Sequence, residues 1–227
     1  MSTLSNVTLR RGGKEPPDIG FASDAISEAQ KVPKGKSVRY AHKKDDSKEW
    51  FVLRATYGRV NKAYDLITKD STEAYLPMKY RNKIIKGKKK RILEPLIPNI
   101  IFVYAERSKI ETLVKDTPEL YFLNYYYNHF EKGPDGKNIP LTVGYNEMMS
   151  FIKATSVDNE HVMLVEPSQC HYKNGDIVRV IEGDFTGVVG RVARVAGQQR
   201  VVVELDGLCT IVTAYIPSAF LEIVNKK

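Results

Sequence analysis

Residues 175–190 read Gly-Asp-Ile-Val-Arg-Val-Ile-Glu-Gly-Asp-Phe-Thr-Gly-Val-Val-Gly, and this stretch decides the fold of the C-terminal part of the chain. Ile177, Val178 and Val180 form an apolar run with the short period of a half-buried strand. A turn containing glycine follows, and a second β-branched run continues through Val195. Strands of this kind separated by glycine turns predict a small β-barrel.

The glycines of this stretch could also suggest a phosphate-binding loop. Gly183, Gly187 and Gly190 are spaced G-x-x-x-G-x-x-G, but a nucleotide loop also needs Gly-Lys-Ser/Thr at the start of a helix. The residues after Gly190 are β-branched and alternate, so these glycines are expected at tight turns and bulges. The Gly-Lys-Ser at 35–37 has Gln30 where such a loop requires glycine.

Composition bounds the class of protein. The 227 residues are enough for two small domains, and the net charge of +8 favours a polyanionic partner, most commonly nucleic acid. We find no apolar run long enough to span a bilayer and no signal peptide, so we expect no membrane association. The two cysteines are too few for a disulfide framework and predict a reduced, cytoplasmic protein.

Residues that could carry catalysis do not converge in the sequence. Cys170-His171 has no second Cys/His cluster to complete a metal site, and the four histidines are scattered. No Ser/His/Asp or Cys/His grouping is recognisable. We therefore expect no enzyme activity, no cofactor and no metal.

Changes in composition divide the chain into four parts. Residues 1–48 are rich in Gly, Pro, Lys and Ser, and predict a flexible basic leader. Residues 49–154 hold alternating strand and helix patterns, residues 155–170 lack periodicity and read as a linker, and residues 171–227 form the barrel domain.

Hydrophobic periodicity predicts an α+β arrangement for residues 49–154, with helices packed on one antiparallel sheet. Ser108 is expected to cap the second helix, with Glu111 at its third position. The expected strands are 50–53, 73–85, 91–93, 100–103 and 120–127, the expected helices are 57–67, 108–115 and 145–154, and 133–136 is expected to be a hairpin turn.

Four segments resemble the N-terminal domain of the NusG family of transcription elongation factors. They are Trp50-Phe51-Val52-Leu53, Tyr75-Leu76-Pro77, Glu94–Val103 and Ile139-Pro140-Leu141, which follow one another in the family's order. The glycine-turn stretch resembles the KOW motif, at the place where that family has its C-terminal domain. The resemblance implies an NGN-like α/β sandwich followed by a small SH3-like KOW barrel.

A basic segment makes the chain similar to specialised antiterminator paralogs of this family. Ile84–Arg91, leading into Glu94–Asn99, is similar to RfaH, and the basic leader resembles the UpxY antiterminators of capsular polysaccharide operons. This implies a monomeric antitermination factor for a surface-polysaccharide operon. Two alternatives stay open: a housekeeping NusG that couples polymerase to Rho or the ribosome, and a ribosome-associated KOW protein.

The resemblance also implies where partners bind. An apolar cavity that holds the clamp helices of RNA polymerase would include Ile97, Ile100 and Phe102. Along a strand, Ile100 and Phe102 share one face and Ile101 and Val103 share the other. One of the two faces must be core, so the alternative is that these residues are core.

Basic residues are the candidates for nucleic-acid binding. Lys86, Lys88, Lys89, Lys90 and Arg91 fall in one dense hairpin that fits the phosphates of upstream or non-template DNA. The alternative is an ordinary solvated surface. The first helix adds Arg59, Lys62 and Lys69, spaced along one face and matching the region where RfaH touches DNA.

The KOW domain is expected to recruit a further partner, which in the family includes Rho and a small-subunit ribosomal protein. Phe185, Val188 and Ile211 are the candidate exposed apolar contacts, and the alternative is simple barrel core. The many valines of this domain disfavour a helix, so we expect it to keep a β fold in the intact chain.

Overall fold

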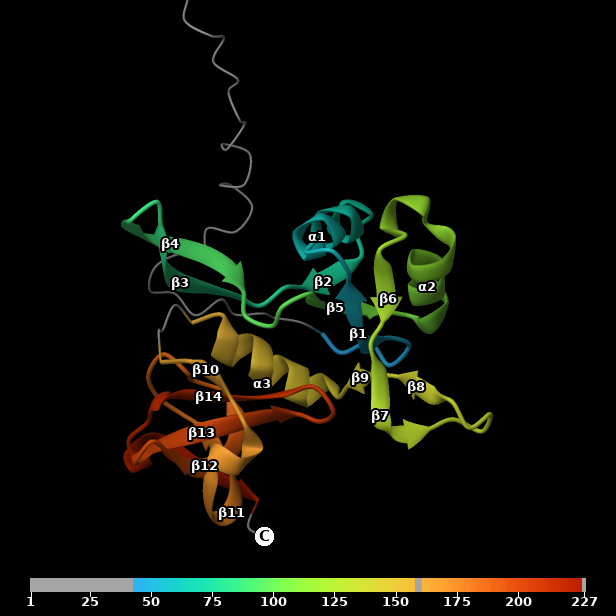
Figure 1. Ribbon diagram of the computed structural model, residues 1–227. Coiled ribbons are helices and arrows are strands. Elements are labelled where there is room, and N and C mark those ends of the chain that lie inside the picture. The colour runs from blue at the N-terminus through green and yellow to red at the C-terminus, as the bar shows by residue number, and fades with distance from the viewer. Residues whose placement is uncertain (1–42, 158–160, 226–227) are drawn as a thin grey trace, which may run out of the picture. The chain divides into compact units, whose positions relative to one another are not determined.

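The computed structural model describes residues 43–157 and 161–225, and Figure 1 shows their arrangement. Most of the segment 1–48 that the sequence predicts to be a flexible leader lies outside the described residues. Within its last residues, Lys44–Lys48 form a turn in which the Lys48 backbone N–H donates to the Asp45 carbonyl at 3.1 Å. The main sheet begins directly after that turn, at Glu49.

The N-terminal domain is built on an antiparallel sheet with the strand order β2-β5-β1-β6, and β9 also pairs with β1. The β1–β5 pairing places Val52 opposite Phe102, and the β1–β6 pairing places Ala55 opposite Leu123. Segments far apart in the sequence thus become neighbours. The strands are β1 (Glu49–Ala55), β2 (Glu73–Tyr75), β5 (Ile100–Ala105), β6 (Leu123–Tyr125) and β9 (Thr142–Val143).

Helices cover both faces of this sheet (Figure 1). On one face, α1 (Val60–Lys69) and α2 (Arg107–Glu111) pack on the odd-numbered side chains of β5, such as Ile101. On the other face, α3 (Tyr145–Thr155) packs on the even-numbered ones, such as Phe102. Burial on both faces explains why β5 is a continuous apolar run, and the α+β prediction is confirmed.

Two hairpins leave the main sheet, β3 (Met78–Ile85) with β4 (Lys88–Pro95), and β7 (Tyr127–Lys132) with β8 (Asn138–Pro140). The single strand expected over 73–85 is therefore wrong. It breaks at Leu76-Pro77 because Pro77 has no N–H to donate, while its carbonyl accepts from the Leu96 N–H at 2.7 Å.

Two other local expectations differ from the structure. Ser108 does not cap α2: Glu106 occupies that position without a side-chain cap, and Thr112–Asp116 form a π-helical turn. The strand expected over 120–127 is interrupted at Tyr126. The Tyr126 N–H donates to the Val52 carbonyl at 3.0 Å, which ends β6 (Leu123–Tyr125) on the main sheet.

The C-terminal domain is a six-stranded antiparallel sheet with the order β10-β14-β13-β12-β11-β15. The prediction of a β fold for this part of the intact chain is confirmed. Within 155–170, where the sequence predicts a linker, β10 pairs with β14. The strands are β10 (Met163–Val165), β11 (His171–Val180), β12 (Val189–Val195), β13 (Gln198–Leu205), β14 (Cys209–Tyr215) and β15 (Leu221–Asn225).

The glycines at 183, 187 and 190 serve two different needs. Gly183 and Gly187 both have a φ of +84°, where a side chain is strained, as expected for turns. Gly190 instead packs closely: a Cβ there would lie 2.2 Å from the Val202 carbonyl oxygen. The expectation of glycines at turns therefore holds for Gly183 and Gly187, whereas Gly190 lies within β12, where a close approach of backbone requires it.

Candidate functional site

The three residues predicted to bind polymerase are buried. Ile97, Ile100 and Phe102 are 9%, 4% and 0% exposed. The Phe102 ring lies 5.3 Å from the ring of Phe151 on α3, measured between centroids. The face of β5 that carries Ile100 and Phe102 is therefore packed, as is Ile97 just before the strand, which agrees with the alternative that these residues are core.

The three residues expected to be exposed on the C-terminal domain are also buried. Phe185, Val188 and Ile211 belong to the apolar interior, so the expectation of exposure is wrong. Phe185 and Val188 lie in the connection between β11 and β12, and Ile211 lies on β14. Whether such an apolar side chain is covered is decided only when the connection and the sheet pack in the folded domain. Their assignment as partner contacts stays a prediction.

The structure brings both sets together in one continuous packed region. We call Ile97, Ile100, Phe102, Phe185, Val188 and Ile211 the shared apolar cluster. Polar contacts accompany it: the Lys153 Nζ donates to the Gly187 carbonyl at 3.2 Å, and the Val189 N–H donates to the Ser150 Oγ at 3.3 Å. Two sites that the sequence treats as separate are thus covered by the same packing.

The basic hairpin, defined here as β3 and β4, has the opposite character. Every residue from Tyr80 to Arg91 is exposed, and Ile84 near its tip is 73% exposed. Lys86 and Gly87 make the turn, with φ values of +50° and +74°, which is the two-residue geometry that suits a twisted hairpin. Figure 1 shows this ribbon extending away from the N-terminal sheet.

Charges on the basic hairpin are only partly neutralised. Glu94 forms ion pairs with Lys83 and, at 3.9 Å, with Arg81 near the base of the ribbon. In the part of the chain that the structure describes, Lys88, Lys89 and Lys90 form no ion pair with a carboxylate. Three neighbouring ammonium groups in solvent give this end of the ribbon a concentrated positive potential.

A second exposed feature lies where the loop before α1 meets the loop before β6. Ala55 at the end of β1 pairs with Leu123 at the start of β6. Tyr57, which follows β1, and Tyr121, which precedes β6, therefore lie on adjacent loops. The loops are joined because the Thr56 N–H and its hydroxyl both donate to the Phe122 carbonyl, at 2.9 and 3.1 Å.

Arg59 lies at the centre of this feature. Its guanidinium carbon lies 5.6 Å from the ring centroid of Tyr57 and 5.3 Å from that of Tyr121, and it hydrogen-bonds the Tyr121 hydroxyl. Lys62 lies on the next turn of α1, 5.8 Å from the Phe122 ring. We call Tyr57, Arg59, Lys62 and Tyr121 the aromatic–cationic cluster.

Sequence reasoning found the cations of this cluster but missed its aromatics. Tyr57 is 82% exposed and Tyr121 is 66% exposed. The local signal that could have pointed to Tyr57 was weak: this bulky residue directly precedes Gly58, and both residues have a positive φ. Lys69, predicted with Arg59 and Lys62, is exposed at the far end of α1, about 10 Å from Lys62 along the helix.

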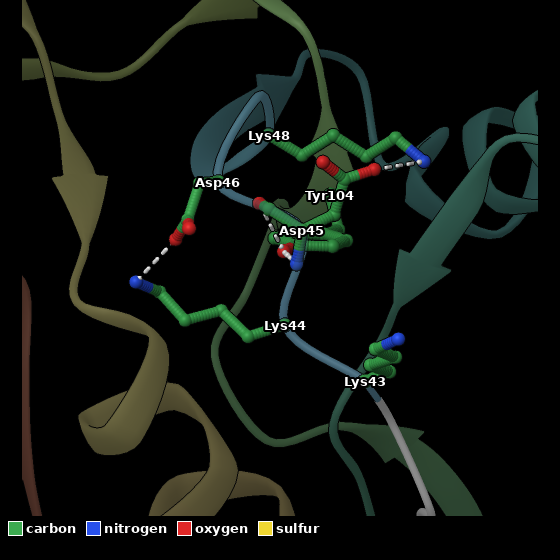
Figure 2. A pocket seen from close by; sticks show the side chains of 6 residues that line it. All are labelled: Lys43, Lys44, Asp45, Asp46, Lys48 and Tyr104. Carbon is green, nitrogen blue, oxygen red and sulfur yellow. Dashed lines mark hydrogen bonds and ion pairs between the residues drawn. The ribbon is translucent and has the colours of Figure 1, made fainter.

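A hollow beside the first strand offers no comparable site. Lys43, Lys44, Asp45, Asp46, Lys48 and Tyr104 line it (Figure 2). Its charges are largely paired: Lys44 with Asp46 at 2.6 Å, and Lys48 with Asp45 at 3.2 Å. Hydrogen bonds from Ser47 hold the pKa of Asp45 below its usual value. Within residues 43–157 and 161–225, no group of three His, Cys, Asp or Glu side chains could hold a metal ion.

The cysteines are poor nucleophiles where they lie. Burial raises the pKa of Cys209 to about 12, and burial also raises the pKa of Cys170. Both therefore stay thiols near neutral pH, whereas the thiolate is the reactive form. Among the described helices, none has the length and apolar character needed to cross a membrane.

The structure thus combines an α+β domain that carries exposed cationic elements with an antiparallel sheet domain that follows it. Residues 48–145 match the family model NusG, described as transcription termination factor nusG. Residues 48–145 are therefore similar to a NusG-family domain. Factors of this family are not enzymes.

Two solved structures are similar over most of the chain. The first, from a study titled "Domain interaction in Thermotoga maritima NusG", is 16% identical and covers 78% of this chain and 98% of that one, with a TM-score of 0.38. The second, the "MjSpt4:Spt5 complex conformation B", is 19% identical and covers 78% and 99%, with a TM-score of 0.23. Both TM-scores are low, and the similarity to the NusG family rests on the matched residues 48–145.

Proposed function

We propose that this protein is an antiterminator that binds transcribing RNA polymerase and suppresses pausing and termination. It would act in the cytoplasm as a monomer. The family match to residues 48–145 supports polymerase as the partner. The similarity of Ile84–Arg91 to specialised paralogs supports dedication to one operon, for which a surface-polysaccharide operon is the candidate. A housekeeping factor coupled to Rho or the ribosome is the alternative.

The observation that carries this proposal is the exposed end of the basic hairpin. Lys88, Lys89 and Lys90 project from a protruding ribbon and form no ion pair among the described residues. Lysines contact phosphates without reading bases, so the ribbon would hold upstream or non-template DNA regardless of sequence. A factor bound to polymerase and to this DNA at the same time would restrain the transcription bubble. It would thereby oppose the rearrangements of the elongation complex that lead to release of the transcript.

Polymerase is proposed to bind at Ile97 and Ile100, in the apolar groove mode that suits an amphipathic helical tip. Their exposed fractions are only 9% and 4%, so the packing over them must open before polymerase can reach them. For Phe102, with no exposed surface and its ring against Phe151, we propose a core role that shapes the groove from beneath.

The C-terminal domain is proposed to recruit a second partner, Rho or a ribosomal protein. If Phe185, Val188 and Ile211 take part, they become available by the same opening, because they lie in the shared apolar cluster. Binding of polymerase and exposure of the second site would then be linked events.

The proposal is tested by changing Lys88, Lys89 and Lys90 together to Gln in the full chain. Readthrough at a terminator, measured with purified polymerase over a series of salt concentrations, is expected to fall toward the level without factor. Each lost phosphate contact lowers the slope of log K against log salt by about 0.9 for duplex or about 0.7 for a single strand. Polymerase pull-down is expected to be unchanged.

The matched control changes the exposed residues Lys115, Lys132 and Lys137 to Gln, which removes the same charge from other surfaces. This control should keep wild-type readthrough. Equal readthrough by both triple variants at every salt concentration would show that the basic hairpin does not contact DNA and serves only as a solubilising surface. Failure of the wild-type protein to bind polymerase would refute the proposed function as a whole.

A further inference from the structure

The segment that enters the C-terminal domain is bound to its sheet as an additional edge strand. We call residues 161–165 the strap. The strap contains β10, which pairs antiparallel with β14 and sets Met163 opposite Val212 and Val165 opposite Thr210. Met163 and Val165 pack on a small apolar cluster of this domain, distinct from the shared apolar cluster. Its buried members are Cys170, Ala193, Val195, Val202 and Val212.

The strap is held by few contacts. Only three residues of β10 pair with β14, and the middle one, Leu164, is 36% exposed. At the start of the strap, Lys79 donates to the Val162 carbonyl and Arg200 donates to the His161 carbonyl. A short edge strand with few buried contacts opens at a lower free energy than a central strand.

Departure of the strap would create a site for another strand. It would leave the outer edge of β14 without a backbone partner, and it would uncover the small apolar cluster beside that edge. An open edge binds an extended segment through main-chain hydrogen bonds, and neighbouring apolar pockets select alternate side chains. The strap itself shows that a chain segment fits there.

Arg200 on β13 indicates which charge such a segment would carry. The side chain is 6% exposed, and its guanidinium donates to the carbonyls of His161 and Thr213, at 3.0 and 2.9 Å, and to the Gln198 Oε1 at 2.9 Å. Among residues 43–157 and 161–225 it pairs with no carboxylate, and its Nε has no hydrogen-bond partner. A buried guanidinium held by neutral acceptors is costly, and a carboxylate would satisfy it better.

We propose that the strap covers a docking site for an extended protein segment, which displaces it. The strap defines the sequence of this ligand, since Val162 is buried and Met163 and Val165 pack on the cluster, whereas Leu164 is partly exposed. A carboxylate in place of His161 would reach Arg200. The expected ligand therefore reads acidic, apolar, apolar, any residue, apolar. This inference rests on the proposed function only for the premise that the C-terminal domain recruits a second partner.

The test uses a fluorescently labelled peptide of residues 161–169 that carries His161→Glu, titrated with the full chain. The strap variant combines Met163→Ser and Val165→Ser, two partly buried positions. In the wild type the site is free only while the strap is open, so the strap variant should bind this probe about 10-fold more tightly.

The matched control makes the same change on the opposite edge of the sheet. Ile223→Ser combined with Val224→Ser removes two apolar side chains of β15 that are 49% and 46% exposed. This control variant should bind the probe with the wild-type Kd. Amide shifts in NMR spectra of the strap variant should change at Thr210 and Val212 on β14 when the probe is added.

A second probe tests the carboxylate without changing the protein. With His161→Gln in the peptide, the Kd for the strap variant should rise about 10-fold, the effect of one charge-assisted hydrogen bond. Adding Arg200→Met to the strap variant should make the two probes bind alike. If that protein does not fold, the comparison of the two probes on the strap variant still decides the point.

Three results would overturn the inference. Equal binding of the Glu probe by wild type and strap variant would mean that the strap covers no site. Equal binding of the two probes would remove the acidic residue from the ligand, and shifts confined to β15 would place binding at the other edge. None of these measurements uses polymerase, so their failure is distinguishable from failure of the proposed function, which shows as a wild-type protein that does not bind polymerase.

Discussion

The shared apolar cluster and the basic hairpin were both predicted as partner sites, and the folded chain treats them in opposite ways. Packing covers the six apolar residues, while the hairpin stands in solvent with every residue from Tyr80 to Arg91 exposed. An apolar side chain gains free energy from any apolar neighbour, whether core or partner. A lysine run cannot be buried cheaply, so its exposure follows from its composition alone. In this protein, a run of charged residues correctly predicted an exposed surface. A run of apolar residues predicted only that these side chains pack against apolar groups, without saying whether those groups belong to the core or to a partner.

The largest expected effect is that of Phe102→Asp, which places a carboxylate in the shared apolar cluster. Loss of a buried phenylalanine costs about 3–5 kcal/mol, and desolvating the carboxylate adds to that cost. The sum is comparable to the whole stability of a domain, so we expect an unfolded N-terminal domain. Circular dichroism and thermal denaturation of the full chain measure this.

Phe130→Asp is the matched control, because the same change falls on a ring that is 85% exposed. It should leave the melting temperature within a few degrees of the wild type. A Phe102→Asp protein that stays folded but no longer binds polymerase would instead show that Phe102 contacts polymerase. The contrast between a packed cluster and an exposed hairpin would then fail for this residue.

A smaller effect is expected from Ser150→Ala combined with Lys153→Ala, which removes two hydrogen bonds beside the shared apolar cluster. Each bond contributes about 0.5–1.5 kcal/mol, so opening should become about 5- to 150-fold more frequent. Hydrogen exchange of the Val188 amide, which donates to the Phe185 carbonyl at 3.0 Å and keeps that partner in the variant, should accelerate accordingly. Polymerase affinity should rise in parallel if Ile97 and Ile100 are the contacts.

Lys115→Ala serves as the control for that double variant and should change neither quantity. Faster exchange at Val188 with no gain in polymerase affinity would show that the cluster opens without exposing the polymerase site. The proposed role of Ile97 and Ile100 would then fail.

The smallest expected effect is that of Ile84→Ala at the tip of the basic hairpin. Ile84 is 73% exposed, so the free energy of unfolding should change by less than about 0.5 kcal/mol. Ile101→Ala, on the buried strand β5, should cost about 2–5 kcal/mol in the same urea titration. Similar costs for the two variants would mean that the hairpin tip is packed in solution, and the contrast between the two regions would be lost.

Sequence patterns predicted the α+β N-terminal domain and the C-terminal β fold because both depend on local periodicity. They predicted strand breaks less well. Leu76-Pro77 ends one strand and begins another because the Pro77 carbonyl bonds to Leu96, which lies beyond the whole basic hairpin in sequence. The same limit applied to the cap of α2, where the chain enters the helix from Glu106 rather than at Ser108.

By itself the sequence determined the order of the two domains, the basic hairpin and the turn glycines at 183 and 187, because period, charge and backbone freedom belong to neighbouring residues. Only the tertiary structure decided that Phe185, Val188 and Ile211 lie inside, since their burial depends on how the connection between β11 and β12 and the outer elements pack on the sheet. It also joined Tyr57 to Tyr121, which lie on adjacent loops because β1 pairs with β6 in the register that sets Ala55 opposite Leu123. That register is a long-range property, fixed by packing of the whole sheet rather than by either loop.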